Sequence, residues 1–186
     1  MAPIEVKVIW DFQNAWVHDE SYDSRSKLKQ RIQNSLNLIN RNYFVHKVIV
    51  VGPRNAKSRL LEAFPNDFDF IYLPDDNIRC GRPQPPCGNM VNRSQDNTNN
   101  TQLVMRTTDR ADLRAVMKMH EFVLSGFTDV LVIQGDVDYL SPIQKVNSFA
   151  NVMVAKPNTD SCAHMMGART WIWEDMISPQ GSYPID

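Results

Sequence analysis

Short apolar runs alternate along the chain with stretches in which apolar residues recur at helical spacing. The runs are typical of buried strands, which we expect at 4–10, 46–51, 68–73, 129–134, 151–155 and 170–173. Helices are expected from Ser24 or Ser26 to about 40, at 55–64, at 111–124, from Ser141 onward and at 160–167. This alternation predicts an α/β fold, with a mainly parallel central sheet and helices on both of its faces.

The expected helix at 111–124 has a clear periodicity. Side chains that are apolar or weakly polar repeat along one of its faces, namely Leu113, Val116, Met117, His120 and Leu124. Such a face usually packs against the core, so we expect His120 to be a core residue rather than a catalytic base. Trp10, Trp171 and Trp173 lie on or beside expected strands, and we expect them in the core as well.

The chain is expected to form one domain with a single interruption. Its 186 residues, 42% of them hydrophobic, suffice for one well-packed core. Residues 75–106 are rich in Asn, Pro, Gly and Gln and have no sustained periodicity, which predicts an insertion into a domain spanning 1–177. Residues 178–186 are expected to form a loose C-terminal tail.

The composition also indicates a compartment. The N-terminal residues lack the basic and then apolar layout of a signal peptide. No apolar stretch approaches the roughly 20 residues that a membrane span needs. The three cysteines make an odd number without the spacing of a disulfide scaffold. We therefore expect a cytoplasmic or nuclear protein that is neither secreted nor embedded in a membrane.

Four aspartates follow expected strands or open an expected helix. Asp11 follows the first strand, Asp136 and Asp138 follow the most apolar strand, and Asp112 opens the helix before that strand. The carboxyl ends of parallel strands meet at the crevice where open α/β sheets bind ligands. Carboxylates gathered there repel one another unless a cation joins them, and hard oxygen ligands suit Mg²⁺ or Mn²⁺. Each acid alone is also typical of a turn or a first helical turn, so the metal-site prediction depends on all four.

A strongly basic window spans residues 25–59. It contains no Asp or Glu and nine basic residues, which are Arg25, Lys27, Lys29, Arg31, Arg41, Lys47, Arg54, Lys57 and Arg59. The window predicts either a solvated surface or a rim that binds phosphates beside a metal site. Under the second interpretation, the substrate-binding candidates are Lys27, Lys29, Arg54, Lys57 and Arg59. Trp16 is then placed to stack a base at the mouth of the site.

Three short motifs together resemble the NYN domain, a branch of the PIN-like ribonuclease superfamily. They are Trp10-Asp11-Phe12-Gln13-Asn14, Arg110-Ala111-Asp112-Leu113 and Gly135-Asp136-Val137-Asp138-Tyr139. The stretch from Asp112 to Ile177, which ends in Trp173-Glu174-Asp175-Met176-Ile177, looks especially like the limkain-type NYN domains of meiosis-arrest proteins. The resemblance covers nearly the whole chain except residues 75–106.

The resemblance implies a PIN-like three-layer α/β/α sandwich and a metal-dependent endoribonuclease, a phosphodiester hydrolase that cuts single-stranded RNA. By match with the family's motifs, the catalytic and metal-binding residues would be Asp11, Asp112, Asp136 and Asp138, with Mg²⁺ or Mn²⁺ as the cofactor. Asn14 would be the supporting polar residue that braces the loop or contacts the substrate. RNA would be the main partner, while protein partners or a homodimer stay open.

Two other functions stay open at this point. A PIN-like domain can bind RNA or protein without cutting, because intact acids do not ensure turnover. An aspartate-nucleophile phosphotransferase also carries an Asp after its first strand. That class expects a second Asp two residues later, where this chain has Gln13, and the departure counts against it.

Overall fold

The central element of the fold is a seven-stranded sheet. The computed structural model describes residues 2–15, 17, 22–53, 56–73, 78–80, 103–105, 107–158 and 168–185. The sheet has the strand order β4-β3-β1-β7-β8-β9, with β2 beside β1, and all of these pairings are parallel. Its strands are β1 (Ile4–Asp11), β2 (Tyr43–Phe44), β3 (Val48–Pro53), β4 (Phe68–Leu73), β7 (Asp129–Ile133), β8 (Asn151–Lys156) and β9 (Arg169–Ile172).

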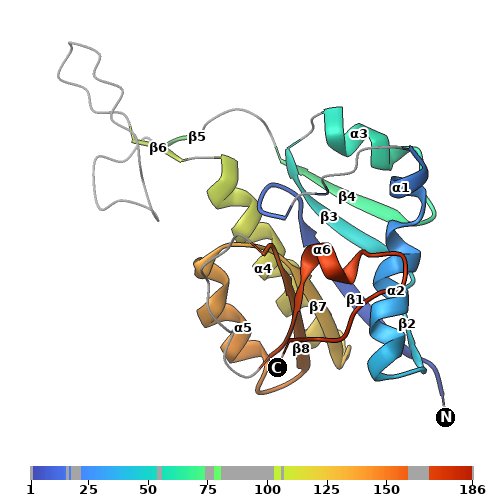
Figure 1. Cartoon of the computed structure of the whole chain (residues 1–186). Coiled ribbons are helices and arrows are strands. Elements are labelled where there is room, and N and C mark those ends of the chain that lie inside the picture. The colour runs from blue at the N-terminus through green and yellow to red at the C-terminus, as the bar shows by residue number, and fades with distance from the viewer. Residues whose placement is uncertain are drawn as a thin grey trace.

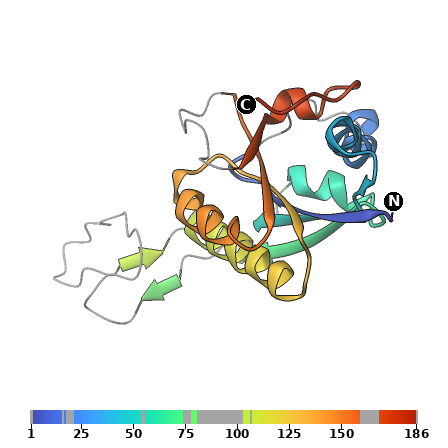
Figure 2. The same ribbon diagram turned by 90° about the horizontal axis from the view of Figure 1, so that it is seen from below.

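Helices cover both faces of this sheet (Figures 1 and 2). One face carries α1 (Tyr22–Ser26), α2 (Leu28–Ile39), α3 (Ala56–Glu62) and α6 (Trp173–Met176), and the other carries α4 (Thr107–Leu124) and α5 (Leu140–Val146). The buried apolar residues accordingly form two clusters, one on each side of the sheet. The expected α/β/α sandwich with a mainly parallel sheet is thus confirmed. Among the described residues, no helix has both the length and the apolar character that a membrane crossing requires.

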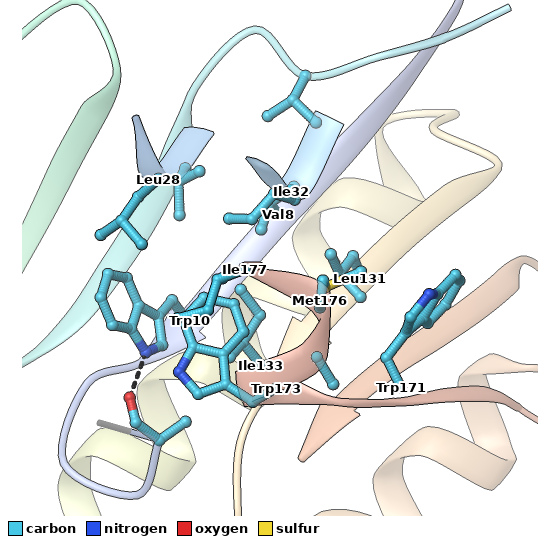
Figure 3. Packing of buried hydrophobic residues seen from close by; sticks show 14 of the residues in the cluster. Val8, Trp10, Leu28, Ile32, Leu131, Ile133, Trp171, Trp173, Met176 and Ile177 are labelled. Carbon is cyan, nitrogen blue, oxygen red and sulfur yellow. Dashed lines mark hydrogen bonds between the residues drawn. The ribbon is translucent and has the colours of Figure 1, made fainter. Parts of the chain in front are cut away.

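Three tryptophans fill the core on the α2 and α6 side of the sheet (Figure 3). Trp10, Trp171 and Trp173 are fully buried, as their positions in the sequence predicted. The ring centroids of Trp10 and Trp173 lie 5.3 Å apart, so the end of β1 packs directly against the start of α6. Burial of such large rings contributes much of the apolar area that stabilises a domain of this size.

The alternation of side chains along β1 decides where its terminal acid lies. Val6, Val8 and Trp10 belong to the cluster on the α2 side, whereas Ile9 belongs to the cluster on the α4 side. Successive side chains of a strand point to opposite faces. Asp11 therefore shares the face of Ile9 and points toward α4.

The inward face of α4 differs from the one expected from the sequence. From Ala111 onward, where the structure describes the side chains of α4, the buried residues are Ala111, Ala115, Met119 and Phe122, and the face with Leu113, Met117, His120 and Leu124 is exposed. The expectation that the bulky stripe packs inward, with His120 in the core, was wrong. Two alanines on the inward face let the helix lie close to the sheet, a packing that hydrophobic size alone does not reveal.

The structure also refines the expected interruption and the expected tail. At the two ends of segment 75–106, β5 (Ile78–Cys80) and β6 (Leu103–Met105) pair antiparallel as a separate two-stranded sheet. Residues 81–102, and the helix expected at 160–167, lie outside the described residues. The C-terminal residues are not loose: the Ser182 amide donates to Ser35 Oγ at 2.9 Å, and the Ile185 amide donates to the Thr170 carbonyl at 2.6 Å.

Candidate metal centre

The turn after β1 holds the first acid of the site in place. The Trp10 indole Nε1 donates to the Ala15 carbonyl at 2.7 Å, the bond drawn in Figure 3, so the buried ring anchors the far end of the turn. The Ala15 amide donates back to the Asp11 carbonyl at 3.1 Å, and the Gln13 amide donates to Asp11 Oδ1 at 3.1 Å. These bonds fix both the backbone and the carboxylate of Asp11.

Asp11 is fully buried and tied to two other segments of the chain. The Tyr139 hydroxyl donates to Asp11 Oδ2 at 2.9 Å. The Asn14 amide nitrogen donates to Asp11 Oδ2 at 2.9 Å and to Asp112 Oδ1 at 3.2 Å. Asn14 therefore bridges the carboxyl groups of β1 and α4, which are about a hundred residues apart in sequence.

The turn after β7 presents the other two acids. Every residue of β7 is buried, and the strand is followed by the buried Gln134, whose Oε1 accepts the Asp136 amide at 2.6 Å. Asp136 Oδ1 in turn accepts the Asp138 amide at 3.1 Å, which closes the turn before the 3₁₀ segment η1 (Val137–Tyr139) and α5. This local side-chain-to-backbone bonding is typical of Asp in tight turns.

Three of the four predicted acids converge. Asp112, Asp136 and Asp138 each offer a carboxylate oxygen, and these oxygens all lie within 4.8 Å of one another. Two oxygens on opposite sides of a Mg²⁺ ion lie about 4.2 Å apart, since each bond measures about 2.1 Å. A small side-chain movement would therefore let this trio hold the ion. Asp11 is not part of the trio and lies behind it, bonded through Asn14 to Asp112.

The electrostatics of the group also suit a cation. Burial, a hydrogen bond to Asp11 and the nearby charges of Asp11, Asp136 and Asp138 raise the pKa of Asp112 to about 8. Burial likewise raises the pKa of Asp11, although hydrogen bonds from Asp112 and Tyr139 oppose that rise. A hydrogen bond between two carboxyl groups requires that one of them keep its proton. A divalent cation could take the place of this proton and relieve the repulsion.

Several described residues of the basic window are paired or buried elsewhere in the fold. Lys27, Lys29 and Lys47 form ion pairs with Asp23, Asp67 and Asp69 at 2.8, 2.5 and 2.9 Å. These acids lie outside the basic window in sequence, so the fold neutralises part of the excess charge that the window alone suggested. Arg25 is buried and donates to the Val17 carbonyl, so it forms no part of a surface rim.

Lys29 in particular lies away from the acid cluster. Its Nζ donates to the His46 carbonyl and pairs with Asp67, whose own carbonyl accepts the amide of the first β3 residue, Val48. Asp11 pairs with Val51, five residues beyond His46. At about 3.3 Å per residue, this is a separation of roughly 16 Å along the strand. The expectation that Lys29 borders the acid site was therefore wrong.

The structure describes only some of the other predicted substrate-binding residues. Arg59 is exposed on α3, a helix that begins just after the carboxyl end of β3. Trp16 and Arg54 lie outside the described residues, and for Lys57 only the backbone is described. Lys27 is exposed at the break between α1 and α2, where a single helix had been expected.

Two residues of the site were not singled out from the sequence. Tyr139 was noted only as part of a motif, yet its hydroxyl bonds to the buried Asp11. Gln134 is the buried polar residue that orients the Asp136 amide. The available signal for Gln134 was a polar residue that ends an otherwise apolar strand. For Tyr139 no sequence signal separates a core ring from a ring whose hydroxyl reaches a carboxylate.

Comparisons with known proteins add information on the fold. No protein-family model matches the chain, and no curated protein matches it in sequence. Among solved structures, the chain is similar to a protein of unknown function from Vibrio parahaemolyticus, with a TM-score of 0.53 and 13% identity. The match covers 91% of this chain and 92% of the other. At this identity the likeness shows a shared fold alone.

Proposed function

We propose that this chain is a divalent-metal-dependent endoribonuclease of the NYN type, which cuts single-stranded RNA. The observation that carries the proposal is the convergence of Asp112, Asp136 and Asp138, with Asp11 bonded behind them at the carboxyl edge of a parallel sheet. Ligand sites of open α/β sheets lie at this edge. The resemblance of the three acidic motifs to the NYN domain supports RNA as the substrate.

The less buried acids would bind the metal, and the buried Asp11 would position them. Asp112, Asp136 and Asp138 would bind Mg²⁺ or Mn²⁺, because their oxygens lie close together and none of the three residues is fully buried. Asp11 would position Asp112 through their hydrogen bond and through the bridging Asn14. The bound ion supplies positive charge that polarises a phosphoryl oxygen and lowers the pKa of a water molecule. No histidine is needed in this scheme.

Tyr139 and Asn14 keep this arrangement rigid. Tyr139 donates to Asp11 from the same turn that carries Asp136 and Asp138, so it links the two acidic turns directly. Asn14 uses one amide group to hold Asp11 and Asp112 together. Preorganised ligands reduce the cost of reorganisation when a metal and a substrate bind. Of the described basic residues, Arg59 is the candidate for contact with an RNA phosphate.

The proposal is tested by cleavage of a labelled single-stranded RNA. The wild type should cut in Mn²⁺ or Mg²⁺ and stop when a chelator is added. Asp136→Asn should lower the rate roughly a hundredfold or more, since a removed electrostatic contact to the reacting phosphate costs about that much. The matched control is Asp69→Asn, which removes the same charge at an exposed site paired with Lys47 and should cut like the wild type.

Two outcomes would contradict the proposal in different ways. Equal cleavage by Asp136→Asn and the wild type would exclude the acid cluster as the catalytic site. Binding of the RNA without cleavage in either metal would instead favour the alternative of a PIN-like module that binds RNA but does not cut it. A filter-binding measurement on the same RNA separates the second outcome from a failure to bind.

A further inference from the structure

The outer face of α4 carries an exposed stripe made of Leu113, Met117, His120 and Leu124. Leu113 and Met117 are 54% and 52% exposed, and Leu124 is 87% exposed. The buried residues of the helix, such as Ala115 and Met119, lie on its opposite face. Three large apolar side chains in one row on a helix are unusual on a surface without a partner.

The spacing of the stripe is symmetric about its centre. Its members are separated by four, three and four residues, which is the spacing of a coiled-coil seam. Reversing the direction of the helix gives the same spacing. In an antiparallel pair of two α4 helices, Leu113 would therefore face Leu124 of the second copy, and Met117 would face His120 of the second copy. A surface that matches itself in this way suits a two-fold interface.

The charges beside the stripe are also self-complementary. Arg114 and Glu121 lie on the same flank of the helix, seven residues and thus two turns apart. In the antiparallel pair, Arg114 beside Leu113 comes opposite Glu121 of the second copy, and the reverse pair forms by symmetry. Within one chain Glu121 contacts Lys118 at 2.7 Å, but its side chain remains 61% exposed and open to a second cation. A parallel pair would lack this match and would align the two helix dipoles unfavourably.

A groove lies along the same flank and provides room for the second helix. It has a volume of about 620 Å³ and is lined by α4 residues that include Arg114, Met117, Glu121 and Leu124, together with Ile71 of β4. Most of its surface is apolar, and its charged residues are Arg114, Lys118 and Glu121. Side chains of a partner helix could therefore bury their apolar parts there while keeping the ion pairs.

We propose that two copies of this chain pair through antiparallel α4 helices. The stripe from Leu113 to Leu124 spans eleven residue steps, or about 16 Å of helix. Contact along such a short helix buries less than the roughly 1,200 Å² of the smallest stable interfaces. The dimer is accordingly weak and depends on concentration. Asp112 lies about 100° around the helix from Leu113 and is not part of the stripe. The pairing uses none of the proposed metal ligands, so it stands independently of the proposed ribonuclease activity.

The first test is sedimentation velocity of the whole chain over a concentration series. The wild type should shift from monomer to dimer as the concentration rises through the micromolar range. Met117→Glu should weaken the association at least tenfold, because it puts a charge at the centre of the seam. The control is Phe149→Glu, which adds the same charge at an 81% exposed aromatic outside α4 and should leave the dimer unchanged. Circular dichroism checks that each variant is folded.

The second test uses paired charge reversals to identify the partner as another copy. Arg114→Glu and Glu121→Arg should each weaken self-association at least tenfold, because like charges then meet twice in each dimer. An equimolar mixture of the two variants should dimerise again, because each new Glu then faces an Arg. A monomeric wild type at all concentrations, equal effects of Met117→Glu and Phe149→Glu, or a mixture that stays monomeric would each overturn the proposal.

Discussion

Asp11 and Asp112 form a pair of carboxyl groups in which burial and mutual repulsion favour a retained proton. The pKa of Asp112 is raised to about 8, mainly by burial and then by its bond to Asp11 and by the acids around it. The Tyr139 hydroxyl and the Asn14 amide stabilise the charge that remains on Asp11. When two carboxyl groups share one site, commonly one keeps its proton and the other is ionised, because ionising both is costly.

This arrangement predicts how the stability of the metal-free protein depends on pH. The unfolded chain releases the Asp112 proton near pH 4, whereas the folded protein keeps it up to about pH 8. The native state thus holds more protons in this window, so its free energy of unfolding falls as the pH rises from about 4 to about 8. Asp112→Asn has no such proton and should lose less stability over the same window.

Urea denaturation in a chelator at pH 5, 6.5 and 8 checks the prediction. The difference in unfolding free energy between Asp112→Asn and the wild type should move in favour of the variant as the pH rises. Added Mn²⁺ should stabilise the wild type at pH 8 and leave Asp112→Asn nearly unchanged, because a ligand that binds only the native state raises its stability. Parallel curves for the two proteins would show that Asp112 titrates normally.

At the scale of elements, the C-terminal segment is a docked part of the domain. Gly181 has a φ of +73°, and a Cβ at this position would lie 2.9 Å from both the amide nitrogen and Oγ of Ser35 on α2. Gly126 has a φ of +89°, and a Cβ there would meet nothing within 4 Å. Both glycines have a positive φ, but only at Gly181 would a side chain also collide with Ser35. Comparing the two positions therefore separates the cost of the backbone conformation from the cost of this collision.

Alanine substitutions at these two positions should have unequal effects. Both Gly181→Ala and Gly126→Ala force a side chain into the left-handed region, which costs about 1–2 kcal/mol. Only Gly181→Ala also crowds a packed contact, which adds about 1–3 kcal/mol. Denaturant titration should therefore show that Gly181→Ala loses about 1–3 kcal/mol more free energy of unfolding than Gly126→Ala does. Equal losses would mean that the segment does not pack on α2 in solution.

The sequence predicted the order of the elements well, because apolar runs and helical spacing report directly on burial. The strand expected at 68–73 has those bounds in the structure, and β1 and β7 differ from expectation by one residue each. The inward face of α4 was missed because alanines pack as closely as larger residues, and size patterns favour the larger ones. The docked tail was missed because its contacts are single hydrogen bonds to distant residues such as Ser35 and Thr170.

Only part of the candidate site could be predicted from the sequence. Asp136 and Asp138 follow β7, so their place at the carboxyl edge of the sheet was predictable from the sequence. Asp112 does not open its helix as expected: α4 begins at Thr107, and Asp112 lies in its second turn. Its convergence with the other two acids therefore depends on how α4 packs on the sheet. Asp11 is buried behind them because it points to the α4 face of β1 and accepts the Tyr139 hydroxyl. Neither the spacing of the motifs nor the composition predicts this burial. The pairing of Lys29 with Asp67 depends on tertiary contacts, so a charge count along the sequence overestimated the basic rim.

At the scale of the whole molecule, the charge distribution decides where RNA would bind. Arg59 and Lys29 are both basic, but Lys29 is paired with Asp67 near the amino ends of β3 and β4. In the Asp136→Asn background, which we expect not to cut, Arg59→Gln should weaken RNA binding. It should also reduce the slope of log affinity against log salt by roughly 0.7, the value for one phosphate contact on a single strand.

The matched change Lys29→Gln should leave both the RNA affinity and its salt slope unchanged. Fluorescence anisotropy of a labelled single-stranded RNA over a KCl series measures both variants. If Lys29→Gln lowers the slope as much as Arg59→Gln does, the RNA path crosses the amino side of the sheet and the acid cluster is not its centre.

The proposed function depends above all on a divalent ion at the acid cluster, at the carboxyl edge of the sheet. The most direct measurement is anomalous diffraction from crystals of the protein soaked in Mn²⁺, with Asp136→Asn crystals as the comparison. We expect an anomalous peak within coordination distance of Asp112, Asp136 and Asp138 in the wild type, and its loss in Asp136→Asn. A wild-type map with no peak among these carboxylates, or with a peak that persists in Asp136→Asn, would contradict it.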